Sequence, residues 1–217
     1  MFLGHFALGF AAKKIEPGVS LATSLAAAQL ADVVWPVFVL TGVERVAVAP
    51  GDTAVTPLRF ESYPYSHSLL TLALWGLAFG ALHFAARGRP RAAAVLGLLV
   101  VSHWFIDVAS HRPDMPLSPW NSTLLGLGLW YSVAATVIVE AALFAAGVAL
   151  YLAATSARDA VGRYGLAAFV AFLAVIYAAN LLGPPPPSVA AVGWAGLIGA
   201  AWLLVWAAWV DRHRAPR

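Results

Sequence analysis

The stretch "VVSHWFIDVASHRPDMPL", from Val100 to Leu117, combines histidines and acids at nearly helical spacing. His103 and Asp107 are four residues apart, so a helix would present both side chains on one face. Imidazole and carboxylate groups bind zinc, manganese or iron when thiolates are absent, and the chain contains no cysteine. The spacing therefore predicts a site for a divalent cation. A purely structural hydrogen bond between the two side chains is the alternative.

The composition indicates that these residues lie inside a membrane. Of the 217 residues, 61% are hydrophobic and only 11% are charged, and the mean hydropathy is +0.80. Ordinary soluble domains have about 25% charged residues, so this class is excluded. The net charge is +3, but the basic residues are scattered at the ends of apolar segments. No basic stripe is present, so we expect no nucleic-acid partner.

We expect an all-α fold: a polytopic membrane helix bundle of about six transmembrane helices, forming one integral membrane domain over residues 1–217. Roughly 20 apolar residues are needed to cross a bilayer. The candidate spans are Val19–Thr41, His67–Ala86, Arg91–Ser110, Leu127–Thr155, Gly162–Gly183 and Ser188–Val210. Met1–Lys14 is too short to span and predicts a partial helix beside the first span. Residues 1–155 carry the candidate site, and residues 156–217 form two C-terminal spans without a recognised motif.

Loop charges predict the orientation, because lysine and arginine collect on the cytoplasmic side. Three basic residues, Arg45, Arg59 and Arg112, fall on one side of the predicted bundle. The other ten fall on the opposite side: Lys13, Lys14, Arg87, Arg89, Arg91, Arg158, Arg163, Arg212, Arg214 and Arg217. We therefore expect a multi-pass protein of a bacterial-type plasma (inner) membrane, with both termini cytoplasmic and the site opening to the outer side.

Ionisable residues from separate segments are predicted to reach one depth. A helical rise of ~1.5 Å per residue gives heights of about 13 to 24 Å above the nearest cytoplasmic end for five of them. They are His5, Asp32, His103, Asp107 and Glu140. His67 lies slightly beyond this layer. Each residue has a simple structural explanation, such as an interior hydrogen bond or an interfacial position. One bound cation explains them together, because it compensates buried carboxylates and keeps imidazoles neutral.

The ligand types favour zinc, with manganese or iron as alternatives. Four residues match the usual ligand number of zinc: Asp32, His67, His103 and Asp107. His5, His111 and Glu140 remain as ligands for a second ion, with Asp107 as a bridge. One ion is the simpler expectation.

The order of these motifs resembles the YdjM-like family of membrane-bound metal-dependent hydrolases. The motifs are "GHFALG", "LADVVWP", "SHS" and "SHWFIDVASHRPDMPL". That family is in turn similar to soluble zinc phospholipases C and single-strand nucleases. Their ligand order of His, Asp, His, HxxxD, His and HxxxE is met here by His5, Asp32, His67, His103 with Asp107, His111 and Glu140. The last motif departs from this pattern, because "TVIVE" has Thr136 where the soluble enzymes have histidine.

The resemblance implies hydrolysis by a metal-activated water, with Asp32 or Glu140 accepting the proton. On the outer loops, Arg59 and Arg112 are candidates to bind a phosphate group. A lipid or lipid-linked phosphoester is therefore the expected substrate.

Alternatives from other classes stay open. The intramembrane acids and histidines would also suit a proton- or cation-coupled transporter or channel. A metal-dependent redox enzyme acting on lipid chains, or a scaffold whose metal only joins helices, would also use such residues. No feature indicates an oligomeric state.

Overall fold

The computed structural model describes all 217 residues. The chain is 68% helical, which confirms the all-α class. The helices are α1 (Leu3–Ile15), α2 (Leu21–Ala28), α3 (Leu30–Leu40), α4 (Pro64–His67), α5 (Leu69–Arg87), α6 (Pro90–Ser110), α7 (Val133–Ala154), α8 (Leu166–Leu182) and α9 (Val189–Arg212). Two short helical turns are η1 (Leu129–Tyr131) and η2 (Val161–Gly165).

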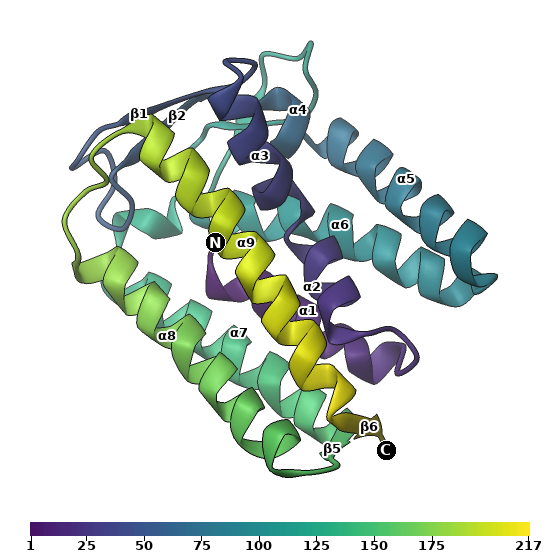
Figure 1. Cartoon of the computed structure of the whole chain (residues 1–217). Coiled ribbons are helices and arrows are strands. Elements are labelled where there is room, and N and C mark those ends of the chain that lie inside the picture. The colour runs from purple at the N-terminus through teal and green to yellow at the C-terminus, as the bar shows by residue number, and fades with distance from the viewer.

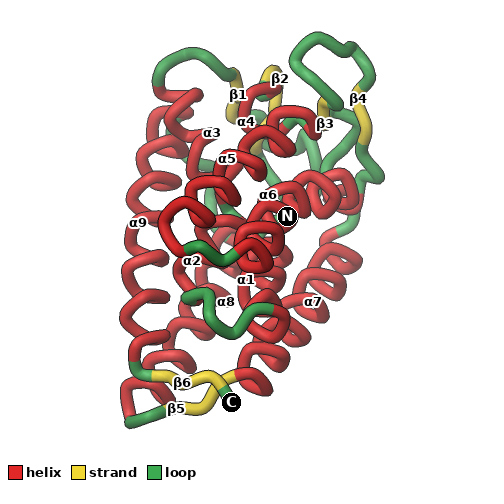
Figure 2. The backbone as a smooth tube through the Cα atoms, turned by 90° about the vertical axis from the view of Figure 1, so that its right-hand side faces the viewer, coloured by secondary structure: helices red, strands yellow, loops and turns green.

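Three small antiparallel pairs complete the fold. They are β1 (Arg45–Val48) with β2 (Leu58–Ser62), β3 (Met115–Pro116) with β4 (Leu124–Leu125), and β5 (Thr155–Ala157) with β6 (Arg214–Pro216). The first two pairs lie at one end of the helix bundle and the third lies at the opposite end (Figure 2). The sequence did not predict these strands, because each is short and formed within a loop.

Five helices are long and apolar enough to cross a membrane: Leu69–Arg87, Pro90–Ser110, Val133–Ala154, Val161–Leu182 and Val189–Arg212. The sixth expected span, Val19–Thr41, is not one straight helix. It consists of α2 and α3, which meet at an angle of 55° around Gln29. The predicted span from Leu127 begins later, at Val133, because Ser132 caps α7 by accepting a hydrogen bond from Ala135 N.

The N-terminal partial helix is confirmed, and it lies inside the bundle (Figure 1). Helix α1 has buried residues on every side and packs against α2, α6 and α7. Its close approach to α7 depends on Gly147, where a Cβ atom would lie 2.3 Å from the carbonyl oxygen of Ala7. A glycine at this position thus places the start of α1, and His5 with it, next to α6 and α7.

A buried polar cluster fixes α1 at the end of the molecule that carries β5 and β6. Asp211 of α9 accepts hydrogen bonds from Lys13 Nζ at 3.1 Å, from Tyr151 Oη at 2.8 Å and from Leu21 N at 3.0 Å. These donors belong to α1, α7 and α2. One carboxylate therefore links four helices far from the candidate site.

We expect Gly147→Val to lower the thermal stability of the protein. The new side chain must push the backbone of Ala7 away, and overpacking of this kind costs about 1–3 kcal/mol. For a chain of this size the apparent melting temperature should fall by about 2–12 °C, measured on the purified protein in detergent. Ala146→Val, at an exposed neighbouring position of α7, is the matched control. Equal melting temperatures for the two variants would contradict this account of the α1–α7 contact.

Candidate metal centre

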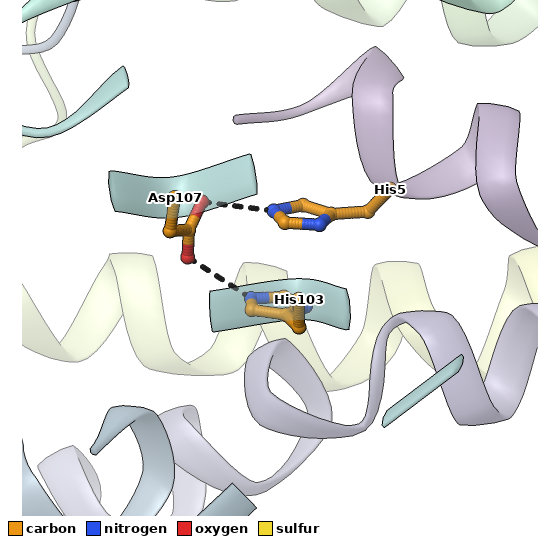
Figure 3. Close-up of side chains that lie close together, drawn as sticks. All are labelled: His5, His103 and Asp107. Atoms are coloured by element: carbon orange, nitrogen blue, oxygen red, sulfur yellow. Dashed lines mark hydrogen bonds and ion pairs between the residues drawn. The ribbon is translucent and has the colours of Figure 1, made fainter. Parts of the chain in front are cut away.

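His103 and Asp107 lie on one face of α6, as their four-residue spacing predicts. Figure 3 shows them with His5 of α1. The Nε2 atom of His103 lies 3.1 Å from Asp107 Oδ2, and the Nε2 atom of His5 lies 3.0 Å from Asp107 Oδ1. The two imidazole rings are stacked, with centroids 3.6 Å apart. All three residues are buried, so α1 and α6 together enclose one carboxylate between two imidazoles.

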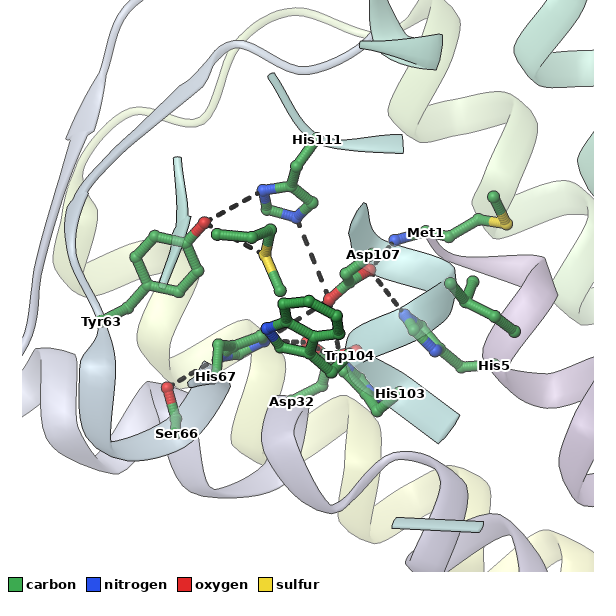
Figure 4. A network of polar contacts seen from close by, with 12 residues as sticks. Met1, His5, Asp32, Tyr63, Ser66, His67, His103, Trp104, Asp107 and His111 are labelled. Atoms are coloured by element: carbon green, nitrogen blue, oxygen red, sulfur yellow. Dashed lines mark hydrogen bonds and ion pairs between the residues drawn. The ribbon is translucent and has the colours of Figure 1, made fainter. Parts of the chain in front are cut away.

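Asp32 and His67 approach the same group from α3 and α4 (Figure 4). Asp32 Oδ1 lies 3.6 Å from His67 Nε2 and 3.8 Å from His103 Nε2. His67 Nε2 lies 3.9 Å from Asp107 Oδ2. The structure thus brings the four residues of the predicted zinc site together. Together with His5, these residues form two triads of possible ligands that share His103: His5–His103–Asp107 and Asp32–His67–His103.

The geometry of Asp32, His67, His103 and Asp107 fits a small divalent cation. Zinc ligands at 2.0–2.2 Å in a tetrahedron are separated by roughly 3.3 Å, and the separations given above for these four residues range from 3.1 to 3.9 Å. The Nε2 atom of His103 is buried and makes no hydrogen bond, although Asp107 Oδ2 lies 3.1 Å away. A buried nitrogen without a hydrogen bond is costly, and a cation between this nitrogen and the carboxylate would satisfy both. The residues present therefore fit a cation.

The ring orientation of His103 is fixed by the other nitrogen. His103 Nδ1 donates to the carbonyl oxygen of Ala28 at 2.8 Å. Ala28 is the last residue of α2, where helical carbonyl groups lose their usual partners. With the proton on Nδ1, the lone pair of Nε2 faces the two acids. Metal-binding histidines typically have such a hydrogen-bonded second nitrogen.

His67 is held in the same way through a buried serine. Its Nδ1 atom donates to Ser66 Oγ at 2.7 Å, and the Ser66 hydroxyl donates to Glu44 Oε2 at 2.6 Å. Glu44 is 1% exposed and also accepts hydrogen bonds from Tyr65 N and Ser66 N at 2.8 and 2.9 Å. Ser66 does not cap a helix, because the N-cap of α5 is Ser68. Glu44 was missed because it lies alone in a loop.

His111 follows the same pattern at the end of α6. Its Nδ1 atom donates to Asp114 Oδ1 at 2.9 Å, and its Nε2 atom lies 4.0 Å from Asp107 Oδ2. Tyr63 Oη also donates to Asp114, at 2.7 Å. Burial lowers the pKa of His111 below its ordinary value, so the ring is neutral and can act as a ligand. His111 belongs to neither triad but is oriented toward Asp107.

Asp114 is stabilised as an anion on the loop side. Burial raises its pKa, but hydrogen bonds from His111, Tyr63 and Arg112 outweigh this effect and lower it below the ordinary value. Arg112 contacts Asp114 at 3.0 Å and Asp52 at 3.1 Å. The charge of Arg112 is therefore already balanced, and its contact in this structure is to the acid that orients His111.

Arg59 and Glu140, like His111 and Arg112, lie outside the triads. Arg59 is 51% exposed and pairs with Asp52 at 2.9 Å. Glu140 of α7 is buried and accepts hydrogen bonds from the first amides of α1, Leu3 N at 2.5 Å and Gly4 N at 3.3 Å. Anions are favoured at helix N-termini. Glu140 thus holds the helix that carries His5, and it belongs to neither group of possible ligands.

Near Glu140, the α-amino group of Met1 contacts Asp107 Oδ1. Thr136, where the soluble enzymes have histidine, donates its hydroxyl to the backbone oxygens of Leu129 and Ser132, both at 2.8 Å. It therefore stabilises the start of α7 and does not point a ligand atom toward the triads.

Comparisons of the chain with protein-family models, with curated proteins and with solved structures find no match. The resemblance to YdjM-like hydrolases accordingly stays a prediction from the motifs.

We expect Glu44→Gln and Ser66→Ala to weaken metal binding roughly 10- to 100-fold, the usual effect of losing a hydrogen bond to a metal-binding histidine. Ser66→Ala removes the acceptor of His67 Nδ1, and Glu44→Gln removes the carboxylate oxygen that accepts from the Ser66 hydroxyl and orients it. The dissociation constant for Zn²⁺ can be measured by competition with a chromogenic chelator. Glu61→Gln, at an exposed acid of the same loop region, should bind Zn²⁺ like the wild type. If Glu44→Gln and Ser66→Ala both bind Zn²⁺ with the wild-type affinity, Glu44 has no role in positioning His67.

Proposed function

We propose that this protein is an integral membrane metal-dependent hydrolase, which cleaves a phosphoester of a lipid or lipid-linked substrate. The observation that supports this proposal most directly is the convergence of three imidazoles on two acids. His67, His103 and His111 each use Nδ1 in a hydrogen bond to the protein and direct Nε2 toward Asp107 or Asp32. Such an arrangement suits a cation better than a purely structural network, in which both nitrogens would be hydrogen bonded.

In this proposal Asp32, His67, His103 and Asp107 hold the metal, and His5 and His111 lie next to them. A bound zinc ion would activate water and polarise a phosphoryl oxygen. Asp32 has the only half-exposed carboxylate of the group, so it is positioned to accept a proton from water at Oδ1 or Oδ2. Arg112 and Asp114 keep His111 in its orientation from the loop side.

A transporter is the second candidate, and the break between α2 and α3 favours it. Discontinuous helices carry the ion sites of many secondary transporters, and Asp32 lies just after this break. Those transporters have related breaks in two halves of the fold, whereas α2 and α3 form the only bent pair here. Cation flux in proteoliposomes without any hydrolysis would support the transporter in place of the hydrolase.

We expect wild-type protein, purified without chelators, to contain close to one divalent metal ion per chain by elemental analysis. Asp107→Asn and His103→Ala should retain less than about a tenth of that amount. Each substitution removes a metal ligand and also removes a contact that orients the neighbouring ligands. Asp159→Asn is a matched control, since Asp159 pairs with His213 at 2.7 Å far from the site. A wild-type protein essentially free of metal would refute the hydrolase.

The activity is measured with a panel of phospholipids in mixed micelles, as release of phosphate or headgroup. We expect release by the wild type, loss after chelation, recovery after addition of Zn²⁺, and none from Asp107→Asn. A metal-replete protein that releases nothing from any phosphoester would instead favour the scaffold.

A further inference from the structure

Two exposed arginines line a pocket at the end of the molecule that carries β5 and β6 (Figure 2). The pocket has a volume of about 300 Å³ and is formed by residues 157–160 together with Arg163 and Tyr164. Neither Arg158 nor Arg163 forms an ion pair, whereas Arg112, in the wall of a pocket among the loops, is paired with two acids. The guanidinium groups of Arg158 and Arg163 are therefore available to an anion.

The one acid in the wall of this pocket, Asp159, is occupied by other partners. Its Oδ2 atom accepts a hydrogen bond from His213 Nδ1 at 2.7 Å, and its Oδ1 atom accepts one from Gly162 N at 2.9 Å. These hydrogen bonds lower the pKa of the Asp159 carboxyl below its ordinary value. The wall thus carries two positive charges without a partner and one negative charge that is already bound.

The C-terminal segment holds the turn that carries these arginines. Arg158 N donates to the carbonyl oxygen of His213 at 2.9 Å, and Arg214 Nη1 donates to the carbonyl oxygen of Gly162 at 2.6 Å. A Cβ atom at Gly162 would lie 2.1 Å from the carbonyl oxygen of His213, so this close approach requires glycine. The pocket is therefore formed before a ligand binds, and a preorganised site loses less conformational freedom on binding.

The pocket lies between the ends of two candidate membrane spans. Val133–Ala154 and Val161–Leu182 are both long and apolar enough to cross a bilayer, and the short connection between them keeps the turn near the membrane surface. Tyr164 is 66% exposed and Trp209 of α9 is 47% exposed, and the ring of Trp209 would lie 3.4 Å from a Cβ atom at Gly165. Exposed aromatic side chains are typical of the level of the lipid headgroups.

A lipid phosphate matches this pocket in position and in charge. Arginine binds phosphate oxygens through paired, charge-assisted hydrogen bonds. An anionic headgroup brings only negative charge to Arg158 and Arg163, whereas a zwitterionic headgroup also brings a cation that the arginines repel. The observations therefore favour an anionic lipid over a zwitterionic one.

We propose that the pocket of Arg158 and Arg163 binds the phosphate group of an anionic phospholipid from the surrounding leaflet. The acyl chains of this lipid lie in the bilayer beside α8. No residue of the candidate metal centre lines the pocket, so the lipid bound here is a ligand of the protein and is not cleaved at this site.

Competition between two lipids tests the site. The full-length protein in a neutral detergent is mixed with equal amounts of phosphatidylglycerol and phosphatidylcholine, and native mass spectrometry counts the lipids that stay bound to each chain. We expect phosphatidylglycerol to bind at least about tenfold more tightly, because its headgroup carries no cation. Equal binding of the two lipids would overturn the proposal.

Substitution of the arginines locates the binding. Arg158→Ala combined with Arg163→Ala should weaken phosphatidylglycerol binding at least about tenfold, because hydrogen bonds to charged groups are lost. Arg87→Ala combined with Arg89→Ala is the matched control, since it removes the same charge from exposed positions between α5 and α6. This control should bind like the wild type.

The melting temperature reports whether each double variant is folded. If the pocket variant does not fold, Arg158→Ala and Arg163→Ala are measured singly, and each should lose part of the affinity. Unchanged affinity in the pocket variants, or an equal loss in the control, would show that the arginines do not form a specific site.

Two further conditions separate this site from soluble phosphate and from the metal centre. Displacement of the lipid by an equimolar amount of glycerol 3-phosphate would indicate a site for a soluble ester and overturn the assignment to a lipid. Treatment with a chelator should leave lipid binding unchanged. A wild type without metal or hydrolysis would therefore refute the proposed function and leave this inference standing.

Discussion

The hydrogen bonds made by the Nδ1 atoms of three histidines are the interactions on which the rest of the site depends. Ser66, the Ala28 carbonyl and Asp114 each accept one of them. Because one nitrogen of each ring is fixed, the other must face the acids, and the rings cannot turn to satisfy Nε2 elsewhere. The break after α2 serves this arrangement directly, since it supplies the carbonyl oxygen that an uninterrupted helix would use internally.

The site must also compensate the negative charges of its acids. Asp32 and Asp107 carry two negative charges, and neutral imidazoles cannot compensate them. Glu140 and the α-amino group of Met1, which lie beside α1, carry one charge of each sign. Glu44 is a further buried acid, and its charge is stabilised by its own hydrogen bonds from Tyr65 N, Ser66 N and Ser66 Oγ. The charges of Asp32 and Asp107 together equal that of one divalent cation. In a medium of low dielectric constant an uncompensated pair of carboxylates is strongly unfavourable, so a bound cation would stabilise the folded arrangement of this region.

The sequence was sufficient for the helical class, for the buried N-terminal helix and for the shared depth of His5, Asp32, His103 and Asp107. Depth follows from helical rise and from the distance to the nearest flanking charge, and both are local quantities. It could not show the bend at Gln29, because both halves of Val19–Thr41 are equally apolar. It also assigned Glu140 from its depth and from its place in the order of motifs, and neither distinguishes a ligand from an acid that binds the start of α1.

The same reasoning from the sequence could not identify the hydrogen-bond and ion-pair partners that lie in loops. Glu44 reaches His67 only because the chain turns after α3, and Arg59 and Arg112 find Asp52 only because β1 and β2 fold back over the end of α6. An arginine beside a site is free to bind phosphate only when no acid has already paired with it, and this depends on tertiary contacts. The loops therefore orient the buried imidazoles of His67 and His111 through Glu44 and Asp114, while the helices leave Asp32 as the one half-exposed acid of the group.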